Sequence, residues 1–337
     1  MIRHLGIWLL GLVLASGASA QTVTTLADGR AGAIIFQSYT PSTILDVLHG
    51  RATNRPVAIN GTLTLPSGAA PVPSGRWPAM VIAHGSGGVG PRERAWAQRL
   101  NAWGIAAFIV DSFTLRGIAF TSEDQSKLAP VAGAIDAFQA LKLLATHPAI
   151  DAERIGVMGF SKGGGVSMHT AFDQVRRSVI DGPLKFAAHV PFYPGCGLAF
   201  QSSQLTRAPI LHLHGDADDW TPLAPCLTWM NWLRGQGVPV ESRVYAGAHH
   251  GFDGGLPLRF LPQVQSFQKC EQVFDLDTMR RYDRASQMPA PRYANFQAAF
   301  NDCGVRGAHL GVDFEAQRRA IADVRGFLTR VFKIEIR

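Results

Sequence analysis

Cysteine is scarce in this chain: there are four among 337 residues, and no two are spaced as Cys-x-x-Cys. That spacing is typical of zinc and thiol-redox sites, so we expect no metal centre. The phosphate-loop pattern Gly-x-x-x-x-Gly-Lys-Ser/Thr and the glycine spacing of a dinucleotide fingerprint are also absent. After residue 20, no segment is long and apolar enough to cross a membrane. These absences exclude a cysteine-held metal, a P-loop nucleotide site and a membrane-integral mature chain.

Basic residues exceed acidic ones, with 32 Lys and Arg against 25 Asp and Glu, for a formal net charge of +7. They are scattered along the chain, and no basic motif has aromatic residues interleaved with it. This distribution favours a solvated basic surface, and we expect no nucleic-acid partner.

The first 20 residues have the three-part layout of a secretory signal peptide. A basic start precedes an apolar run over 5–14, and small residues ending at Ala20 follow. The apolar run is short for a membrane-spanning helix, so cleavage after Ala20 is favoured over an uncleaved anchor. We expect an exported protein, periplasmic or secreted. With 47% hydrophobic residues, the part over 21–337 is long enough to fold as a single α/β domain.

The four cysteines stand at Cys196, Cys226, Cys270 and Cys303. An even number in an exported chain favours two disulfides. Three pairings are open. We favour sequential pairing, because each bridge then closes a moderate loop and contributes about 3 to 4 kcal/mol on the chain-entropy estimate.

Apolar runs and amphipathic segments alternate along most of the chain, which predicts a doubly wound, mostly parallel sheet with helices on both faces. The expected strands are 57–65, 79–83, 105–110, 155–158, 186–192, 209–214 and 240–245. The expected helices are 92–103, 129–146, 164–172, 223–234 and, closing the fold, 314–332.

The stretch from 254 to 311 interrupts this alternation. It contains two cysteines, several prolines and only short periodic pieces, so we interpret it as an insertion before the last helix, stapled by Cys270 and Cys303. It either covers the functional site or forms a surface excursion. Two segments have similar sequences: Gly247-Ala-His-His-Gly-Phe-Asp just before the insertion, and Gly307-Ala-His-Leu-Gly-Val-Asp at its end.

The segment R-I-G-V-M-G-F-S-K-G-G-G, from Arg154 to Gly165, is the most informative in the chain. It places Gly-x-Ser-x-Gly where a short buried strand turns into a helix, which is the context of a nucleophile elbow. Gly159 and Gly163 remove side chains that would collide with the crossing chain. Ser161 is therefore the candidate nucleophile; the alternative is an ordinary glycine-rich turn.

A serine hydroxyl needs a base, and the base needs an acid that orients it. In α/β-hydrolases these arrive in the order serine, acid, histidine. Among three aspartates after the strand 209–214, we favour Asp218 as the acid, since Asp216 and Asp219 suit turn or capping roles.

The candidate bases follow the next strand. His250, followed by Gly-Phe, is our choice for the general base. His249 is its main rival, and His309, directly before the last helix, ranks third.

Acyl transfer also needs donors for a developing oxyanion. The backbone amide of Lys162 is one candidate, because it directly follows the nucleophile. The loop His84-Gly-Ser-Gly-Gly would supply the other, through the amide of Ser86 or Gly87.

Two further side chains are candidates for substrate binding. Arg116 is placed to hold a substrate carboxylate, or else forms an internal ion pair with Asp111 or anchors a loop. Trp220 either lines the pocket or lies buried beneath its loop.

Together, the segments H-G-S-G-G, V-D-S-F-T-L-R-G, G-F-S-K-G-G, Y-P-G-C, H-G-D-A-D-D-W-T-P and A-H-H-G-F-D resemble the dienelactone hydrolase family of α/β-hydrolases over 79–253 and the final helix. The resemblance implies a cofactor-free hydrolase acting on small-molecule esters or lactones through Ser161, Asp218 and His250. The enzymes that give the family its name use a cysteine nucleophile, so Ser161 favours a general carboxylic-ester hydrolase.

Two alternatives belong to other functional classes. A serine peptidase of the prolyl oligopeptidase type shares the motif and chain order, but no propeller-like repeats precede the domain. A non-catalytic binding protein on the same fold has no need for candidates at all three triad positions.

Overall fold

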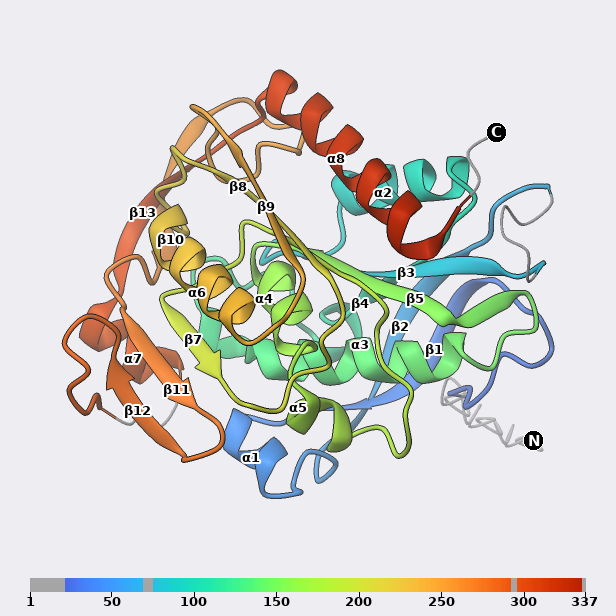
Figure 1. Ribbon diagram of the computed structural model, residues 1–337, viewed down its shortest axis with the longest axis horizontal. Coiled ribbons are helices and arrows are strands. Elements are labelled where there is room, and N and C mark those ends of the chain that lie inside the picture. Colours follow the sequence, from blue (N-terminus) through green and yellow to red (C-terminus); the bar gives the residue numbers. More distant parts are fainter. Residues whose placement is uncertain (1–21, 69–74, 292–295, 335–337) are drawn as a thin grey trace, which may run out of the picture.

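The computed structural model describes residues 22–68, 75–291 and 296–334, so the predicted signal peptide lies outside the described residues. An eight-stranded sheet forms the centre, in the order β1-β2-β4-β3-β5-β6-β8-β9 (Figure 1). The first two pairings are antiparallel and the others are parallel. The strands are β1 (Gly32–Tyr39), β2 (Pro56–Thr64), β3 (Trp77–Ala83), β4 (Ala106–Asp111), β5 (Ile150–Phe160), β6 (His189–Phe192), β8 (Ile210–Gly215) and β9 (Val240–Tyr245).

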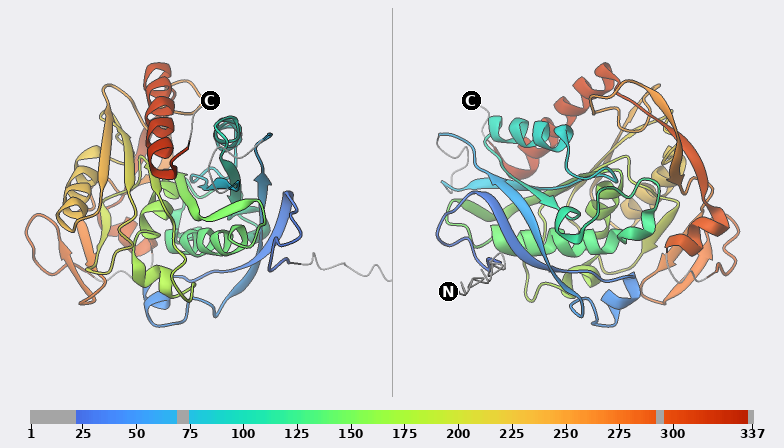
Figure 2. Two further views of the ribbon diagram at one scale, coloured as in Figure 1. Left: turned by 45° about the vertical axis from the view of Figure 1, so that its right-hand side comes forward. Right: turned by 180° about the vertical axis from the view of Figure 1, so that it is seen from behind.

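Helices cover both faces of this sheet (Figures 1 and 2). Helices α2 (Pro91–Ala102) and α8 (Phe314–Phe332) pack on one face, where their apolar residues join one buried cluster. Helices α3 (Pro130–Leu144), α4 (Lys162–His169) and α6 (Leu223–Gly235) pack on the other. The predicted doubly wound α/β-hydrolase sheet is confirmed. Short helices α1 (Ile44–Leu48) and α5 (Asp173–Arg177) and two 3-10 turns (Thr114–Arg116 and Gln125–Lys127) complete this part.

The insertion before α8 has its own secondary structure and lies along one side of the sheet, the orange part of Figure 1. Strands β10 (Arg259–Ser266) and β13 (Val305–Leu310) pair with each other. Strands β11 (Gln272–Asp275) and β12 (Arg280–Asp283) form a three-stranded sheet with β7 (Leu198–Gln201). Helix α7 (Phe296–Cys303) precedes β13.

Two disulfides hold this side of the molecule together. Cys196 is bonded to Cys226 and Cys270 to Cys303, which is the sequential pairing that loop length favours. The second bridge fastens the start of β11 to the end of α7, so the insertion is stapled as predicted. Among the described residues, no helix is long and apolar enough to span a membrane.

Candidate active site

Ser161 stands at a sharp turn between β5 and α4. Its backbone has φ 55° and ψ −113°, an unusual conformation for a residue other than glycine. The turn is held by the Ser161 amide, which donates to the Phe192 carbonyl at 3.0 Å. A Cβ at Gly159 would lie 2.1 Å from the Gly163 carbonyl oxygen, and one at Gly163 would lie 2.1 Å from that of Ala83. The two glycines of the motif are therefore required by close backbone approach.

Asp218 and His250 form a buried hydrogen-bonded pair on the loops that follow β8 and β9. His250 Nδ1 and Asp218 Oδ2 are 2.8 Å apart, and the two residues are only 2% and 4% exposed. Three further donors fix the carboxylate: the amides of Trp220 and Thr221 at 2.9 and 2.8 Å, and the Thr221 hydroxyl at 3.0 Å. Nδ1 of the imidazole is thus committed to the acid, which leaves Nε2 as the nitrogen available for proton transfer.

Burial by itself would raise the pKa of Asp218, but the neighbouring imidazoles outweigh it. His250 and His214 together hold the pKa of this carboxyl well below its ordinary value, through charge and hydrogen bonding. His214 Nε2 lies 3.5 Å from Asp218 Oδ2 and 2.6 Å from the Thr221 carbonyl oxygen. Asp218 is therefore an anion at neutral pH. No role was predicted for His214 from the sequence, although it is the first residue of the motif H-G-D-A-D-D-W-T-P and belongs to β8.

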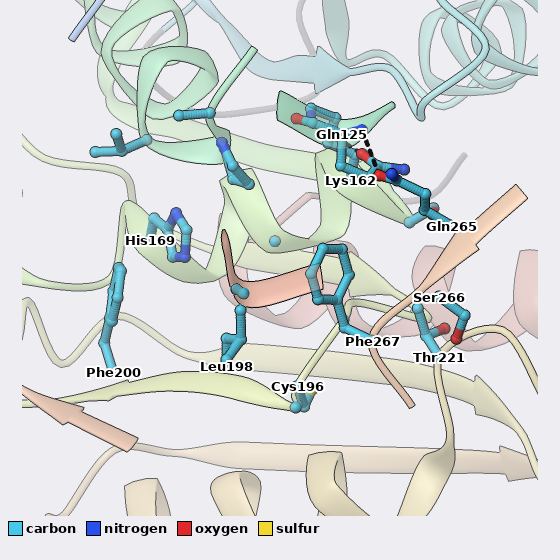
Figure 3. Close-up of a pocket in the computed structure, with 18 of the residues that line it drawn as sticks. Gln125, Lys162, His169, Cys196, Leu198, Phe200, Thr221, Gln265, Ser266 and Phe267 are labelled. Carbon is cyan, nitrogen blue, oxygen red and sulfur yellow. Dashed lines mark hydrogen bonds between the residues drawn. The ribbon is translucent and has the colours of Figure 1, made fainter. Parts of the chain in front are cut away.

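Ser161 lines a cavity of about 290 Å³. Figure 3 shows this cavity with Lys162, Gln125 and Phe267 among its labelled wall residues. Trp220 lines it and also packs against His250, with the two rings tilted by 40° and their centroids 4.8 Å apart. The cavity is therefore next to the buried pair, although no hydrogen bond joins the hydroxyl of Ser161 to the imidazole among the described residues. The apolar part of the wall includes Ile44, Leu45, Val131, Leu198, Phe200, Pro225 and Phe267.

The polar part of the wall is a chain of hydrogen bonds that connects the elbow to the predicted oxyanion loop. Lys162 Nζ donates to Gln125 Oε1 at 3.0 Å, and Gln125 Nε2 donates to Ser86 Oγ at 3.0 Å. Burial lowers the pKa of Lys162 to about 7. Ser86 lines the cavity with Lys162, whereas Gly87, the second candidate of this loop, is not part of its lining.

The insertion supplies part of the cavity wall. Gln265, Ser266, Phe267 and Gln268 line it, and Gln265 Oε1 accepts from the Gln125 amide at 2.8 Å. Neither Gln125 nor Gln265 was identified from the sequence, because the two are 140 residues apart and only folding brings them into contact.

Arg116 does not line the cavity. Its guanidinium makes a bidentate pair with Asp136 of α3 at 2.7 and 2.8 Å, and its side chain is only 5% exposed. It also donates to the carbonyl oxygens of Ser112 and Tyr39. The predicted carboxylate-binding role therefore does not fit, since the fork is already occupied. The loop anchor is the correct alternative, with Asp136 as the ionic partner in place of Asp111.

The rival acids and bases have other partners. Asp216 accepts from the Gly247 amide at 2.7 Å, which joins the loop after β8 to the loop after β9. Asp219 does not cap a helix; it accepts from His309 Nδ1 at 2.7 Å. The ring of His249 lies near that of His309, tilted by 46°, with centroids 5.5 Å apart. Of the three histidines, only His250 contacts Asp218.

The strand order and the strand–turn–helix at Ser161 define an α/β-hydrolase. Residues 61–256, more than half of the chain, match the dienelactone hydrolase family. The chain belongs to this family and is a carboxylic-ester hydrolase.

Individual relatives are more distant. The chain is 27% identical over 209 residues to a probable 2-oxo-3-(5-oxofuran-2-ylidene)propanoate lactonase from a Bradyrhizobium species, covering 58% of this chain and 82% of the relative. A propionate-bound esterase from Thermogutta terrifontis is 18% identical with a TM-score of 0.46, covering 58% of this chain and 81% of that one. A structure assigned as a dienelactone hydrolase from Klebsiella pneumoniae is 21% identical with a TM-score of 0.48, covering 66% and 88%.

Proposed function

We propose that this enzyme cleaves carboxylic ester or lactone bonds through an acyl-enzyme on Ser161, with His250 as general base and Asp218 as its orienting acid. The observation that carries the proposal is the position of Ser161: a strained elbow on a cavity whose wall residue Trp220 packs against the Asp218–His250 pair. Family membership supports the ester or lactone substrate, and the relative from Bradyrhizobium has a lactonase name.

The reaction has two halves. Ser161 Oγ attacks the substrate carbonyl while His250 Nε2 takes its proton and then gives it to the departing alkoxide. Water next attacks the acyl-enzyme by the same route and releases the acid. The short bond from Ser161 to His250 is expected to form when substrate fills the cavity, as catalytic hydrogen bonds often tighten only in the complex.

The oxyanion is stabilised by backbone amides in this proposal. Lys162 is the first residue of α4, and backbone amides in the first turn of a helix have no hydrogen-bond partner within that helix. The second donor is the amide of Ser86 or Gly87. The hydrogen bonds from Lys162 Nζ to Gln125 and from Gln125 to Ser86 fix the distance between the two donors, which preorganises the oxyanion site. Trp220 then forms the side of the pocket nearest the base.

We also infer that the enzyme acts after export, in the periplasm or outside the cell. The disulfides Cys196–Cys226 and Cys270–Cys303 are compatible with an oxidising compartment, and the start of the chain reads as a signal peptide. The mature protein would be one domain over 21–337, with the insertion at 254–311 forming one wall of its active site.

Labelling with a fluorophosphonate tests the assignment, because this probe reacts only with an activated serine. Labelling should be lost in Ser161→Ala and in His250→Ala, and retained in His249→Ala and His309→Ala. Equal labelling of all four variants would refute the proposed triad. Hydrolysis of a panel of nitrophenyl esters and lactones by the purified mature chain then defines the acyl preference.

A further inference from the structure

A second polar cluster lies beside the proposed triad and is not used by it. Asp219, His249 and His309 each offer one ligand atom, and these atoms all lie within 4.8 Å of one another. All three residues are partly exposed, so a solute has access to them. The ester-hydrolysis mechanism assigns none of them a role.

The hydrogen bonds within this cluster do not use all of its possible metal-ligand atoms. Asp219 accepts from the His309 amide at 2.8 Å and faces His309 Nδ1 at 2.7 Å. Nδ1 of His249 is buried and has no hydrogen-bond partner within the described part of the chain. Ring nitrogens of four buried histidines also lack a partner in the described part of the chain, and His249 differs from His147, His169 and His189 in having two further ligating groups beside it.

The chain brings these residues together through its two segments of similar sequence. His250 and Leu310 form a parallel bridge, and the Gly311 amide donates to the His250 carbonyl at 3.0 Å. The histidine before each bridged residue, His249 or His309, therefore lies on the same side of this contact. Asp219 approaches them from the loop after β8.

We propose that Asp219, His249 and His309 form a binding site for a divalent transition-metal ion of the Zn²⁺ class. Two imidazoles and one carboxylate are a ligand set that suits zinc, and three protein ligands leave a fourth position for water. Zn–N and Zn–O bonds of about 2.0 to 2.2 Å place tetrahedral ligand atoms roughly 3.4 Å apart. Mg²⁺ and Ca²⁺ prefer oxygen ligands and are not expected to bind.

The site links three segments that matter for the active site. Asp219 is adjacent to Asp218, His249 is adjacent to His250, and His309 belongs to β13 of the insertion. A bound ion would clamp the insertion onto the loops that present the acid and the base. The absence of Cys-x-x-Cys spacing does not bear on a site made of two imidazoles and a carboxylate. A second cluster, formed by His212, His214 and Cys226, is unsuitable because Cys226 is in a disulfide.

The test uses the mature chain without a polyhistidine tag, stripped with EDTA and titrated with ZnCl₂. We expect one Zn²⁺ per chain by calorimetry, and a rise in Tm of about 5 °C at a hundredfold excess over Kd. MgCl₂ should change neither quantity. With Co²⁺ in place of Zn²⁺, visible absorption typical of low-coordinate imidazole ligation should appear.

Variants separate this site from adventitious binding. His309→Asn and His249→Ala should each lose the Tm shift and the Co²⁺ absorption, whereas His49→Ala, at an exposed histidine elsewhere, should retain both. Retained fluorophosphonate labelling of the first two variants verifies that they fold. Absence of Zn²⁺ binding to the wild type, or equal binding by all variants, would overturn the proposal and leave the triad assignment untouched.

Discussion

The tight crossing at the elbow makes Gly163→Ala a severe change despite its size. The added Cβ would lie 2.1 Å from the carbonyl oxygen of Ala83 and 2.7 Å from that of His84. Both atoms belong to the backbone at the end of β3, so no flexible side chain can move aside. Overpacking lowers the unfolding free energy by about 1 to 3 kcal/mol, and so close an overlap belongs at the upper end of this range. Ala in place of a helical Gly raises the unfolding free energy by about 1 kcal/mol, because Ala has the higher helix propensity. The expected net loss of unfolding free energy is about 2 kcal/mol.

Thermal and urea unfolding measure this loss. A decrease of about 2 kcal/mol corresponds to a Tm lowered by about 3 °C, because the unfolding entropy is about 2.1 cal/mol/K per residue over roughly 300 residues. Because His84 begins the predicted oxyanion loop, kcat for a nitrophenyl ester should also fall, by up to about 10² if one oxyanion donor is displaced.

Gly165→Ala is the matched control, because Gly165 lies in the same helix and nothing stands within 4 Å of an added Cβ. It should leave the unfolding free energy unchanged or raise it by up to about 1 kcal/mol. If Gly163→Ala is as stable as Gly165→Ala, the steric explanation of the motif is wrong.

Three further changes test other parts of the argument. Asp218→Asn cannot orient the imidazole of His250, so kcat should fall by about 10⁴ with KM little changed; a loss below tenfold in a nitrophenyl ester assay would remove Asp218 from the triad. Replacing Cys270 and Cys303 by Ser should lower the unfolding free energy by about 4 kcal/mol, given the sequence separation of 33. It should also raise KM, because the insertion lines the cavity. If neither the melting temperature nor KM changes, the disulfide does not hold the insertion in place. The folded-state pKa of Lys162 is lowered to about 7, so its burial penalty is fully present below pH 7 and is lost as pH rises toward the ordinary value of 10.5. Lys162→Met should therefore stabilise the fold by up to about 4 kcal/mol at pH 6 and by less at pH 9, and a pH-independent difference in urea midpoints would refute the lowered pKa.

Most of the central sheet could be predicted because strands such as β3, β4 and β6 are buried on both faces and appear as apolar runs. Strand β9 is mostly half-exposed and was predicted from its place in the alternation of strands and helices. Strand 240–245 and helix 314–332 have in the structure the bounds that the sequence predicts. The edge strand β1 was missed because its apolar run is short: buried positions alternate along it, but the third of them is Ser38. The helix predicted over 164–172 begins two residues earlier, at Lys162, directly after the nucleophile. The strands of the insertion escaped because they are short or largely exposed, and only their pairing defines them.

In the candidate site, too, residues with a local sequence pattern could be predicted, whereas residues defined by long-range contacts could not. Chain order and local motifs select Asp218 and His250, which the structure joins by a hydrogen bond; their catalytic roles stay predictions. Partners such as Gln125 and Gln265 lie far apart in the chain and leave no sequence pattern. Arg116 was misinterpreted for this reason, because its buried partner Asp136 belongs to a helix whose packing is unknown at the sequence level.

The hydrogen bonds of the insertion bear on how the pocket selects its substrate. Trp220 Nε1 donates to the Gln265 carbonyl at 2.9 Å, and Ser266 Oγ donates to the Trp220 carbonyl at 2.7 Å. Gln265 also accepts from the Gln125 amide, next to the predicted oxyanion loop. Each bond contributes about 1 kcal/mol, and opening the insertion would break all of them together and expose buried groups without partners. We therefore expect the insertion to act as a fixed wall rather than a gate, and we expect the acyl or alcohol group to be limited by the pocket wall that includes Phe267 and Phe200.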